Sequence, residues 1–246
     1  MKPVNDEAVR SAKHRESSQS VGSPVLESQG VPELAQLPKV ARMPVVLQAI
    51  VLAGGSSTRM GRPKALLETP DGRPFLVRIV ETLRAAGLAP VTVVTGVHHE
   101  AVVSLLASRP ELTEDVRVIR NTAPERGQLS SLLAGLEAAA GPGTEGVLVT
   151  LVDVPLVSVE TVLATAEAWR QRRAPVTRPA IGEAHGHPVI FDRQALDALR
   201  GASLAQGAKA VIRAYGELVH NVPVTDRGCL VDVDTPDDYR RLTIAP

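Results

Sequence analysis

The chain has little cysteine, few aromatic residues and no net charge, and each shortage excludes a class of protein. Its one cysteine, Cys229, cannot form an internal disulfide or, alone, a zinc site, so we expect a small buried hydrophobic residue there. Aromatic residues make up 2% of the 246 residues, too few for the stacking surfaces that bind single-stranded nucleic acid. Lys and Arg number 27, as do Asp and Glu, so the basic excess of a nucleic-acid-binding protein is missing too.

Long hydrophobic runs are also absent. No apolar segment reaches the roughly 18 residues that span a bilayer, and the N-terminus lacks the basic-then-apolar pattern of a secretion signal. We therefore expect a cytoplasmic protein with no membrane partner and no nucleic-acid partner. Hydrophobic residues still make up 44% of the chain, which is enough for a core built from Val, Leu, Ile and Ala.

Residues 1–44 differ in composition from the rest of the chain. They are rich in Ser, Glu, Lys, Gln and Gly and show no sustained apolar period, so we expect a disordered or weakly helical tail. Met43 lies just before the first convincing strand, and a second hypothesis is that translation starts there and the tail is not translated. Residues 45–246 are expected to form a single domain, and the intact mass of the natural protein tests the start site.

From residue 45 onward, strand-like and helix-like segments alternate. Strands are predicted at 45–53, 91–96, 116–121 and 146–154, and helices at 75–87, 100–108, 130–141 and 158–173, the last beginning at Ser158. Later segments predict strands at 187–191, 217–224 and 229–233 and helices at 192–201, 205–216 and from Pro236. This alternation predicts an α/β, Rossmann-like fold of three α/β/α layers, with a mostly parallel sheet and some antiparallel pairing late in the chain.

The loop after the first strand carries the strongest chemical signal. It lies in the stretch AIVLAGGSSTRMGRPKALL, and ligands of open α/β sheets bind beyond the carboxyl ends of the strands. Gly54 and Gly55 let backbone N–H groups approach a ligand, while Arg59 and Lys64 add positive charge, so a polyphosphate ligand is expected. The spacing of the glycines fits neither the P-loop nor the dinucleotide-binding fingerprint.

A third pattern fits this loop. The segment LAGGSSTRMGRPK resembles the signature L-A-[AG]-G-x-S-x-R-M-G-x-x-K of the nucleotidyltransferases that activate molybdopterin. The resemblance implies a fold like that of the nucleotide-diphospho-sugar transferases. It also implies that Arg59 and Lys64 bind the triphosphate and that the nucleotide is contacted by Leu52, Ala53, Gly54 and Gly55.

Two sets of carboxylates are placed to hold a metal ion. Nucleotidyl transfer attacks the α-phosphorus of an NTP, and Mg²⁺ bound by one or two carboxylates suits the charge of its phosphates. Asp153 follows a predicted strand in VLVTLVDVP, and in the resembled family this D-x-P aspartate is a magnesium ligand. Asp232 and Asp234 alternate with valines in LVDVDTPDDY, the segment that provides the family's second metal-facing residue, and we favour Asp234.

Two middle segments extend the resemblance. NTAPERGQLSSLLAGL, residues 121–136, implies base or sugar contacts by Gly127, Gln128 and Ser130, although Ser130 would also suit an ordinary helix N-cap. GEAHGHPVIF, residues 182–191, resembles a stretch of the cytidylyltransferase branch and implies that His187 and Pro188 shape the pterin side of the site. The adjacent pair at 98–99 is expected to be two surface histidines.

The resemblance predicts an enzyme that transfers NMP from an NTP to the phosphate of a molybdopterin-type acceptor and releases pyrophosphate. Arg59, Lys64 and Asp153 would be its catalytic residues, and a molybdoenzyme or its chaperone is a further expected partner. The middle segments favour CTP, whereas the LAGG sequence is usual in guanylyltransferases and keeps GTP open. Two alternatives remain: a nucleotidyltransferase for a sugar phosphate or another phospho-acceptor, and a non-catalytic nucleotide-binding partner of a molybdoenzyme.

Overall fold

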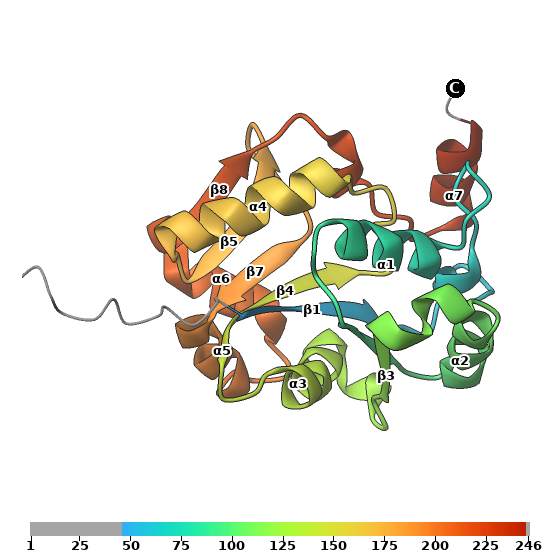
Figure 1. Ribbon diagram of the computed structural model, residues 1–246, viewed down its shortest axis with the longest axis horizontal. Coiled ribbons are helices and arrows are strands. Elements are labelled where there is room, and N and C mark those ends of the chain that lie inside the picture. Colours follow the sequence, from blue (N-terminus) through green and yellow to red (C-terminus); the bar gives the residue numbers. More distant parts are fainter. Residues whose placement is uncertain (1–45, 245–246) are drawn as a thin grey trace, which may run out of the picture. The chain divides into compact units, whose positions relative to one another are not determined.

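A computed structural model describes residues 46–244 of the chain, so the tail predicted at 1–44 lies outside the described residues (Figure 1). Within 46–244, eight strands form one sheet in the order β3-β2-β1-β4-β7-β5-β6, and β8 pairs with β5. The strands are β1 (Val46–Ala53), β2 (Val91–Thr95), β3 (Val116–Arg120), β4 (Thr144–Leu151), β5 (Val176–Ile181), β6 (Ala184–His185), β7 (Val189–Asp192) and β8 (Val219–Pro223).

The sheet is mostly parallel, as predicted. Pairs β1–β2, β2–β3, β1–β4 and β5–β8 are parallel, whereas β7 runs antiparallel to both β4 and β5, and β6 runs antiparallel to β5. Because β1 and β4 are parallel neighbours, with Leu52 opposite Leu151, the loops that follow them begin side by side. That shared edge is where the candidate site forms.

Helices cover both faces of the sheet and confirm the three-layer prediction. They are α1 (Phe75–Ala85), α2 (His99–Ala107), α3 (Gln128–Ala139), α4 (Val159–Arg172), α5 (Arg193–Arg200), α6 (Gly207–Tyr215) and α7 (Pro236–Ile244). Short 3₁₀ turns are η2 (Lys64–Leu66), η3 (Pro110–Asp115), η4 (Pro124–Arg126), η5 (Gly216–Leu218) and η6 (Arg227–Leu230). None of the helices within 46–244 is both long enough and apolar enough to cross a membrane.

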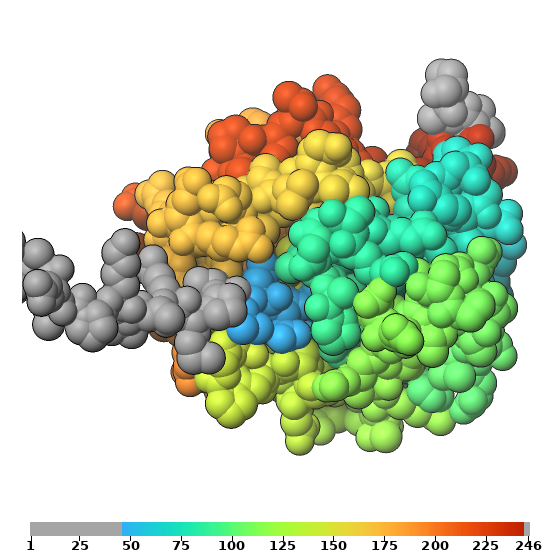
Figure 2. All heavy atoms as spheres, in the orientation of Figure 1, coloured from blue at the N-terminus to red at the C-terminus, as the bar shows by residue number. Residues whose placement is uncertain are grey.

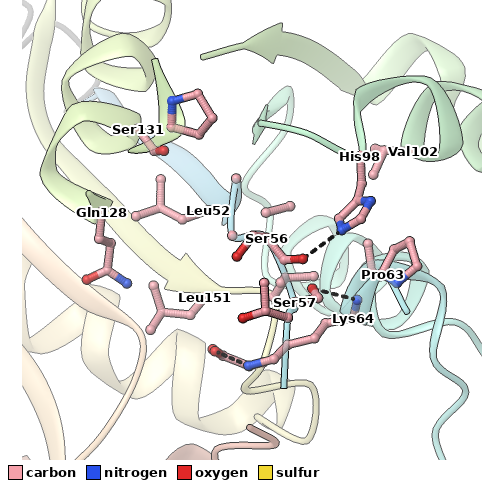
Figure 3. Close-up of a pocket in the computed structure, with 18 of the residues that line it drawn as sticks. Leu52, Ser56, Ser57, Pro63, Lys64, His98, Val102, Gln128, Ser131 and Leu151 are labelled. Carbon is pink, nitrogen blue, oxygen red and sulfur yellow. Dashed lines mark hydrogen bonds and ion pairs between the residues drawn. The ribbon is translucent and has the colours of Figure 1, made fainter. Parts of the chain in front are cut away.

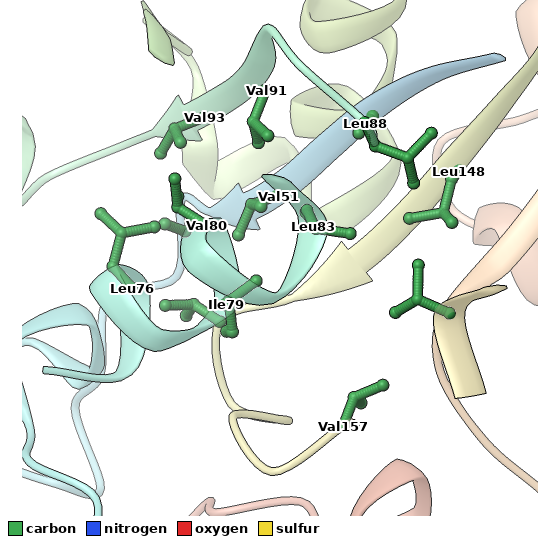
Figure 4. Close-up of a cluster of buried hydrophobic side chains, with 14 of the residues drawn as sticks. Val51, Leu76, Ile79, Val80, Leu83, Leu88, Val91, Val93, Leu148 and Val157 are labelled. Carbon is green, nitrogen blue, oxygen red and sulfur yellow. The ribbon is translucent and has the colours of Figure 1, made fainter. Parts of the chain in front are cut away.

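The core lies on both sides of β1, which explains its uninterrupted apolar sequence. Val51 faces α1, α2 and α4, where it joins Leu76, Val80 and other buried side chains (Figure 4). Ile50 faces the opposite layer, where the buried side chains come from α3, α5 and α6. Each fully buried Val, Leu or Ile adds about 1.5–3 kcal/mol, so a core of aliphatic residues suffices without many aromatics. In the space-filling view, little of the blue β1 remains visible between the segments that cover it (Figure 2).

Most predicted boundaries agree with the structure to within a few residues, but β5 and β6 were not predicted, and two predictions need correction. The predicted strand at 229–233 is wrong, because η6 ends at Leu230 and the following residues form an irregular segment. This segment bonds to loops instead of a strand: the Val233 N–H donates to the Asp153 carbonyl at 2.9 Å. Helix α3 begins at Gln128 after an N-cap at Gly127, so Ser130 lies in the first turn and is not the cap.

Candidate active site

The loop after β1 presents unpaired backbone donors. Among the residues that the structure describes, no protein group accepts a hydrogen bond from the N–H groups of residues 55–59. Ser57 has a positive φ of 52°, and its carbonyl accepts from the N–H groups of Met60 and Gly61, both at 3.0 Å. Its hydroxyl accepts from the Lys64 N–H at 3.3 Å, which ties the loop to η2. Free N–H groups in a turn of this kind form a site for an anion.

Lys64 joins the two predicted metal ligands. Its Nζ donates to Asp153 Oδ2 at 3.0 Å and to Asp234 Oδ1 at 2.6 Å, and only 12% of its side chain is exposed. Arg59 donates from Nη2 to Asp234 Oδ2 at 3.0 Å. Asp153 follows β4, Lys64 opens η2, and Asp234 precedes α7, so three distant segments meet at the edge of the sheet.

The charges of this cluster depend on one another. Burial on its own lowers the pKa of Lys64, but the hydrogen bond to Asp234 and the charge of Asp153 outweigh it, so the pKa lies above the ordinary 10.5. The hydrogen bond from Lys64 holds the pKa of Asp234 below its ordinary value. Lys64 is therefore a cation and Asp234 an anion near neutral pH.

The two carboxylates fit a divalent metal that also binds phosphate. Asp153 Oδ1 is buried without a hydrogen-bond partner, and the other oxygen already points at a cation, Lys64 Nζ. Within residues 46–244, no cluster of three or more His, Cys, Asp or Glu side chains could enclose a metal. A pair of carboxylates is what Mg²⁺ uses when substrate phosphates and water complete its shell.

A cavity of about 350 Å³ extends from this cluster over the loop (Figure 3). Most predicted nucleotide-binding residues line it: Leu52, Ala53, Gly54, Gly55, Arg59, Lys64, Gly127 and Gln128. Ser130 is not among the lining residues, and its hydroxyl donates to the Gly127 carbonyl at 2.8 Å. Its neighbour Ser131 lines the cavity instead, and Asn121 Nδ2 donates to both serine hydroxyls at 2.9 Å.

A second cavity of about 450 Å³ adjoins the first, and the two share Leu52, Gln128 and Leu151. It contains His187, as predicted for the pterin side, and also Asp232. Its cationic lining residues are Arg178, Lys209 and Arg213. Burial lowers the pKa of His187, so its ring is neutral, and burial also raises the pKa of Asp232. Pro188 lines neither cavity and lies on a small apolar gap beside α1.

His98 had no role in the site predicted from the sequence. This partly exposed residue lines the first cavity, and its Nε2 lies 3.0 Å from the carbonyl oxygen of Ser56 (Figure 3). One sequence signal could have identified His98 as a site residue: it comes just after a predicted strand, at the same edge of the sheet as the glycine loop. His99, by contrast, does not line this cavity and has its Nδ1 2.7 Å from Thr95 Oγ1.

A mostly parallel sheet whose edge joins a cationic glycine loop to two carboxylates, one just after β4 and one just before α7, fits a nucleotidyltransferase. The chain belongs to the family described as the MobA-like NTP transferase domain, whose model matches residues 49–220. Both the predicted family and the predicted enzyme class are therefore confirmed.

Named relatives agree with this family. A probable molybdenum cofactor guanylyltransferase of Rhodopirellula baltica is 35% identical over 140 residues, which cover 56% of this chain and 62% of that protein. The match therefore spans less than two thirds of the relative. A protein of the same name from Mycobacterium tuberculosis is 34% identical over 147 residues, covering 60% of this chain and 68% of that protein.

Solved structures confirm the fold. Rv0371c from Mycobacterium tuberculosis aligns with a TM-score of 0.67 at 26% identity, covering 82% of this chain and 98% of that one. The same protein has been solved as a complex with manganese, which aligns with a TM-score of 0.64 at 25% identity over 82% and 99% of the two chains.

Proposed function

We propose that the chain transfers a nucleotidyl group from an NTP to the phosphate of a molybdopterin-type acceptor and releases pyrophosphate. The convergence of Lys64 on Asp153 and Asp234, beside a loop of free N–H groups, carries the proposal. The relatives named molybdenum cofactor guanylyltransferases support this acceptor.

The loop and its cations would bind the triphosphate. The free N–H groups of residues 55–59 would donate to phosphate oxygens, and Arg59 and Lys64 would turn from the carboxylates to the phosphates. Asp153 and Asp234 would hold Mg²⁺, which when bound would offset charge on the phosphate oxygens. The catalytic contribution of these residues is positioning and neutralisation of charge.

The second cavity would hold the acceptor. It adjoins the first, and its cations Arg178, Lys209 and Arg213 suit an anionic group, while apolar residues such as Phe191 and Ile212 suit a flat ring. His187 lies in this cavity as a neutral side chain. Because the attacking phosphate of the acceptor is already an anion, the reaction needs no strong protein base.

CTP is the proposed nucleotide, on the strength of residues 121–136 and 182–191. GTP is a second candidate, since the first loop carries Gly54 in its LAGG sequence and the named relatives are guanylyltransferases. Gly127 and Gln128 line the cavity and would contact the base or the sugar. Delivery of the product to a molybdoenzyme or its chaperone stays a prediction, as does the cytoplasmic location.

Pyrophosphate release tests this function. The chain would be incubated with Mg²⁺ and CTP, GTP, ATP or UTP, with and without molybdopterin, and in parallel with a panel of sugar phosphates. We expect release that requires molybdopterin and is greatest with CTP, and that Asp153→Asn abolishes. Release only with a sugar phosphate would favour the other acceptor class, and nucleotide binding without release would favour a non-catalytic partner.

A further inference from the structure

His98 connects α2 to the glycine loop. It follows β2 and occupies the N-cap position of α2, and its side chain reaches the backbone of Ser56 (Figure 3). The distance between its Nε2 and the Ser56 carbonyl oxygen is 3.0 Å. Because a carbonyl oxygen can only accept a hydrogen bond, Nε2 must carry the proton and donate it.

We infer that His98 is a positioning residue for the triphosphate-binding loop, acting through the Ser56–Ser57 peptide. A trans peptide is planar, so the Ser56 carbonyl and the Ser57 N–H point in opposite directions. By holding the carbonyl, His98 fixes the direction of the Ser57 N–H, one of the loop donors that no protein group accepts. This inference rests on the proposed function, in which those donors bind phosphate.

The direction of this peptide matters because the loop binds an anion. If the peptide turned over, the negative end of the Ser56 carbonyl would replace the N–H in the phosphate site. Few other contacts oppose such a turn: residues 55, 56, 58 and 59 are exposed, and Ser57 already has a positive φ. The nearest restraints, the Ser57 carbonyl to Met60 and Gly61 and the Ser57 hydroxyl to Lys64, lie on the far side of the Ser56–Ser57 peptide.

The contact is not a general requirement of the fold. The His98 side chain is only partly buried and belongs to none of the three hydrophobic clusters. The structural histidine of this segment is His99, whose Nδ1 lies 2.7 Å from Thr95 Oγ1, which itself donates to the Ile119 carbonyl. Loss of the His98 ring should therefore affect the loop far more than it affects stability.

Three variants separate these roles. His98→Phe has an aromatic ring of similar size without a hydrogen-bond donor, and His98→Gln has a side-chain amide N–H that can replace the Nε2–H donor. His220→Phe, on β8, makes the same chemical change outside both cavities. A hydrogen bond contributes about 0.5–1.5 kcal/mol net, so its loss in His98→Phe corresponds to a roughly 2- to 12-fold larger dissociation constant for Mg·CTP or Mg·GTP.

We expect that weakening in His98→Phe, recovery of most affinity in His98→Gln and no change in His220→Phe. The KM for the acceptor and the melting temperature should stay unchanged in all three variants. Equal nucleotide affinity in His98→Phe and the unmodified protein would overturn the inference. So would equal weakening in His98→Phe and His98→Gln together with a lower melting temperature, because that pattern indicates a merely structural residue.

One measurement needs no nucleotide and so separates this inference from the proposed function. The ¹³C resonance of the Ser56 carbonyl in the free protein should move in His98→Phe and return in His98→Gln. If it is the same in every variant, His98 does not hold the peptide, whatever binds the loop. If the resonance behaves as expected but the unmodified protein binds no NTP, the proposed function fails, and only the part of the inference that His98 holds the Ser56–Ser57 peptide is kept.

Discussion

Lys64→Met removes the one side chain within residues 46–244 that hydrogen-bonds both proposed metal ligands, and it tests the site most sharply among single substitutions. The Nζ lies 3.0 Å from Asp153 Oδ2 and 2.6 Å from Asp234 Oδ1, with 12% of the side chain exposed. Loss of one hydrogen-bond donor that stabilises a transition state typically costs about 2.7–4 kcal/mol, a factor of roughly 10²–10³ in rate. We expect kcat/KM for pyrophosphate release to fall by about that factor.

Arg62→Ala is the matched control for this substitution. Arg62 lies in the same loop, but its guanidinium stacks 5.2 Å from the centre of the Tyr239 ring and does not line the cavity. The control removes an equal charge from the same loop, so it should change kcat/KM by less than about threefold, as screening by solvent predicts for an exposed charge. An almost unchanged rate in Lys64→Met, or an equal loss in Arg62→Ala, would refute the role given to Lys64.

Three further outcomes follow from the same geometry. Lys64 lowers the pKa of Asp234, so its contribution to the free energy of unfolding should be complete above the ordinary pKa of 3.8 and disappear as the pH falls through the lowered value. Urea unfolding of the unmodified protein and Lys64→Met at several pH values measures this difference in stability. A difference that does not change with pH contradicts the prediction. A Cβ at Gly96 would clash with the Gly54 carbonyl, so Gly96→Ala should lower the free energy of unfolding by about 1–3 kcal/mol and weaken Mg·NTP binding. A Cβ at Gly141 would meet open space, so Gly141→Ala should change neither quantity. Calorimetry measures both the unfolding and the binding. Chelation of divalent ions should abolish pyrophosphate release, and added Mg²⁺ should restore it; release that survives chelation would exclude a metal from the reaction.

Most of the sheet and its helices could be predicted because their signals are local, although β5 and β6 were not predicted from the sequence. The apolar run at 45–53 needs burial on both faces, and Ser158 does cap α4, where its hydroxyl accepts from the Thr161 N–H at 3.2 Å. The edge that holds Lys64 and Asp153 also follows from local order, since parallel neighbours end on the same side.

The contacts made by irregular segments could not be predicted. Alternation with valines suggested that Asp232 and Asp234 share one face of a strand, but the chain there bonds to loops, and the two carboxylates line different cavities. His98 gave no periodic signal, because its partner is a backbone carbonyl in a distant loop. Such contacts depend on the tertiary fold and not on the sequence nearby.

A crystal structure of the chain with Mn²⁺ and a non-hydrolysable analogue of CTP, repeated with that of GTP, tests the central claim most directly. We predict an anomalous peak for manganese bound by Asp153 and Asp234, with the triphosphate over residues 55–59 and Lys64 turned from the carboxylates to a phosphate. A metal bound elsewhere, or a nucleotide that leaves Lys64 paired with both aspartates, would contradict the account.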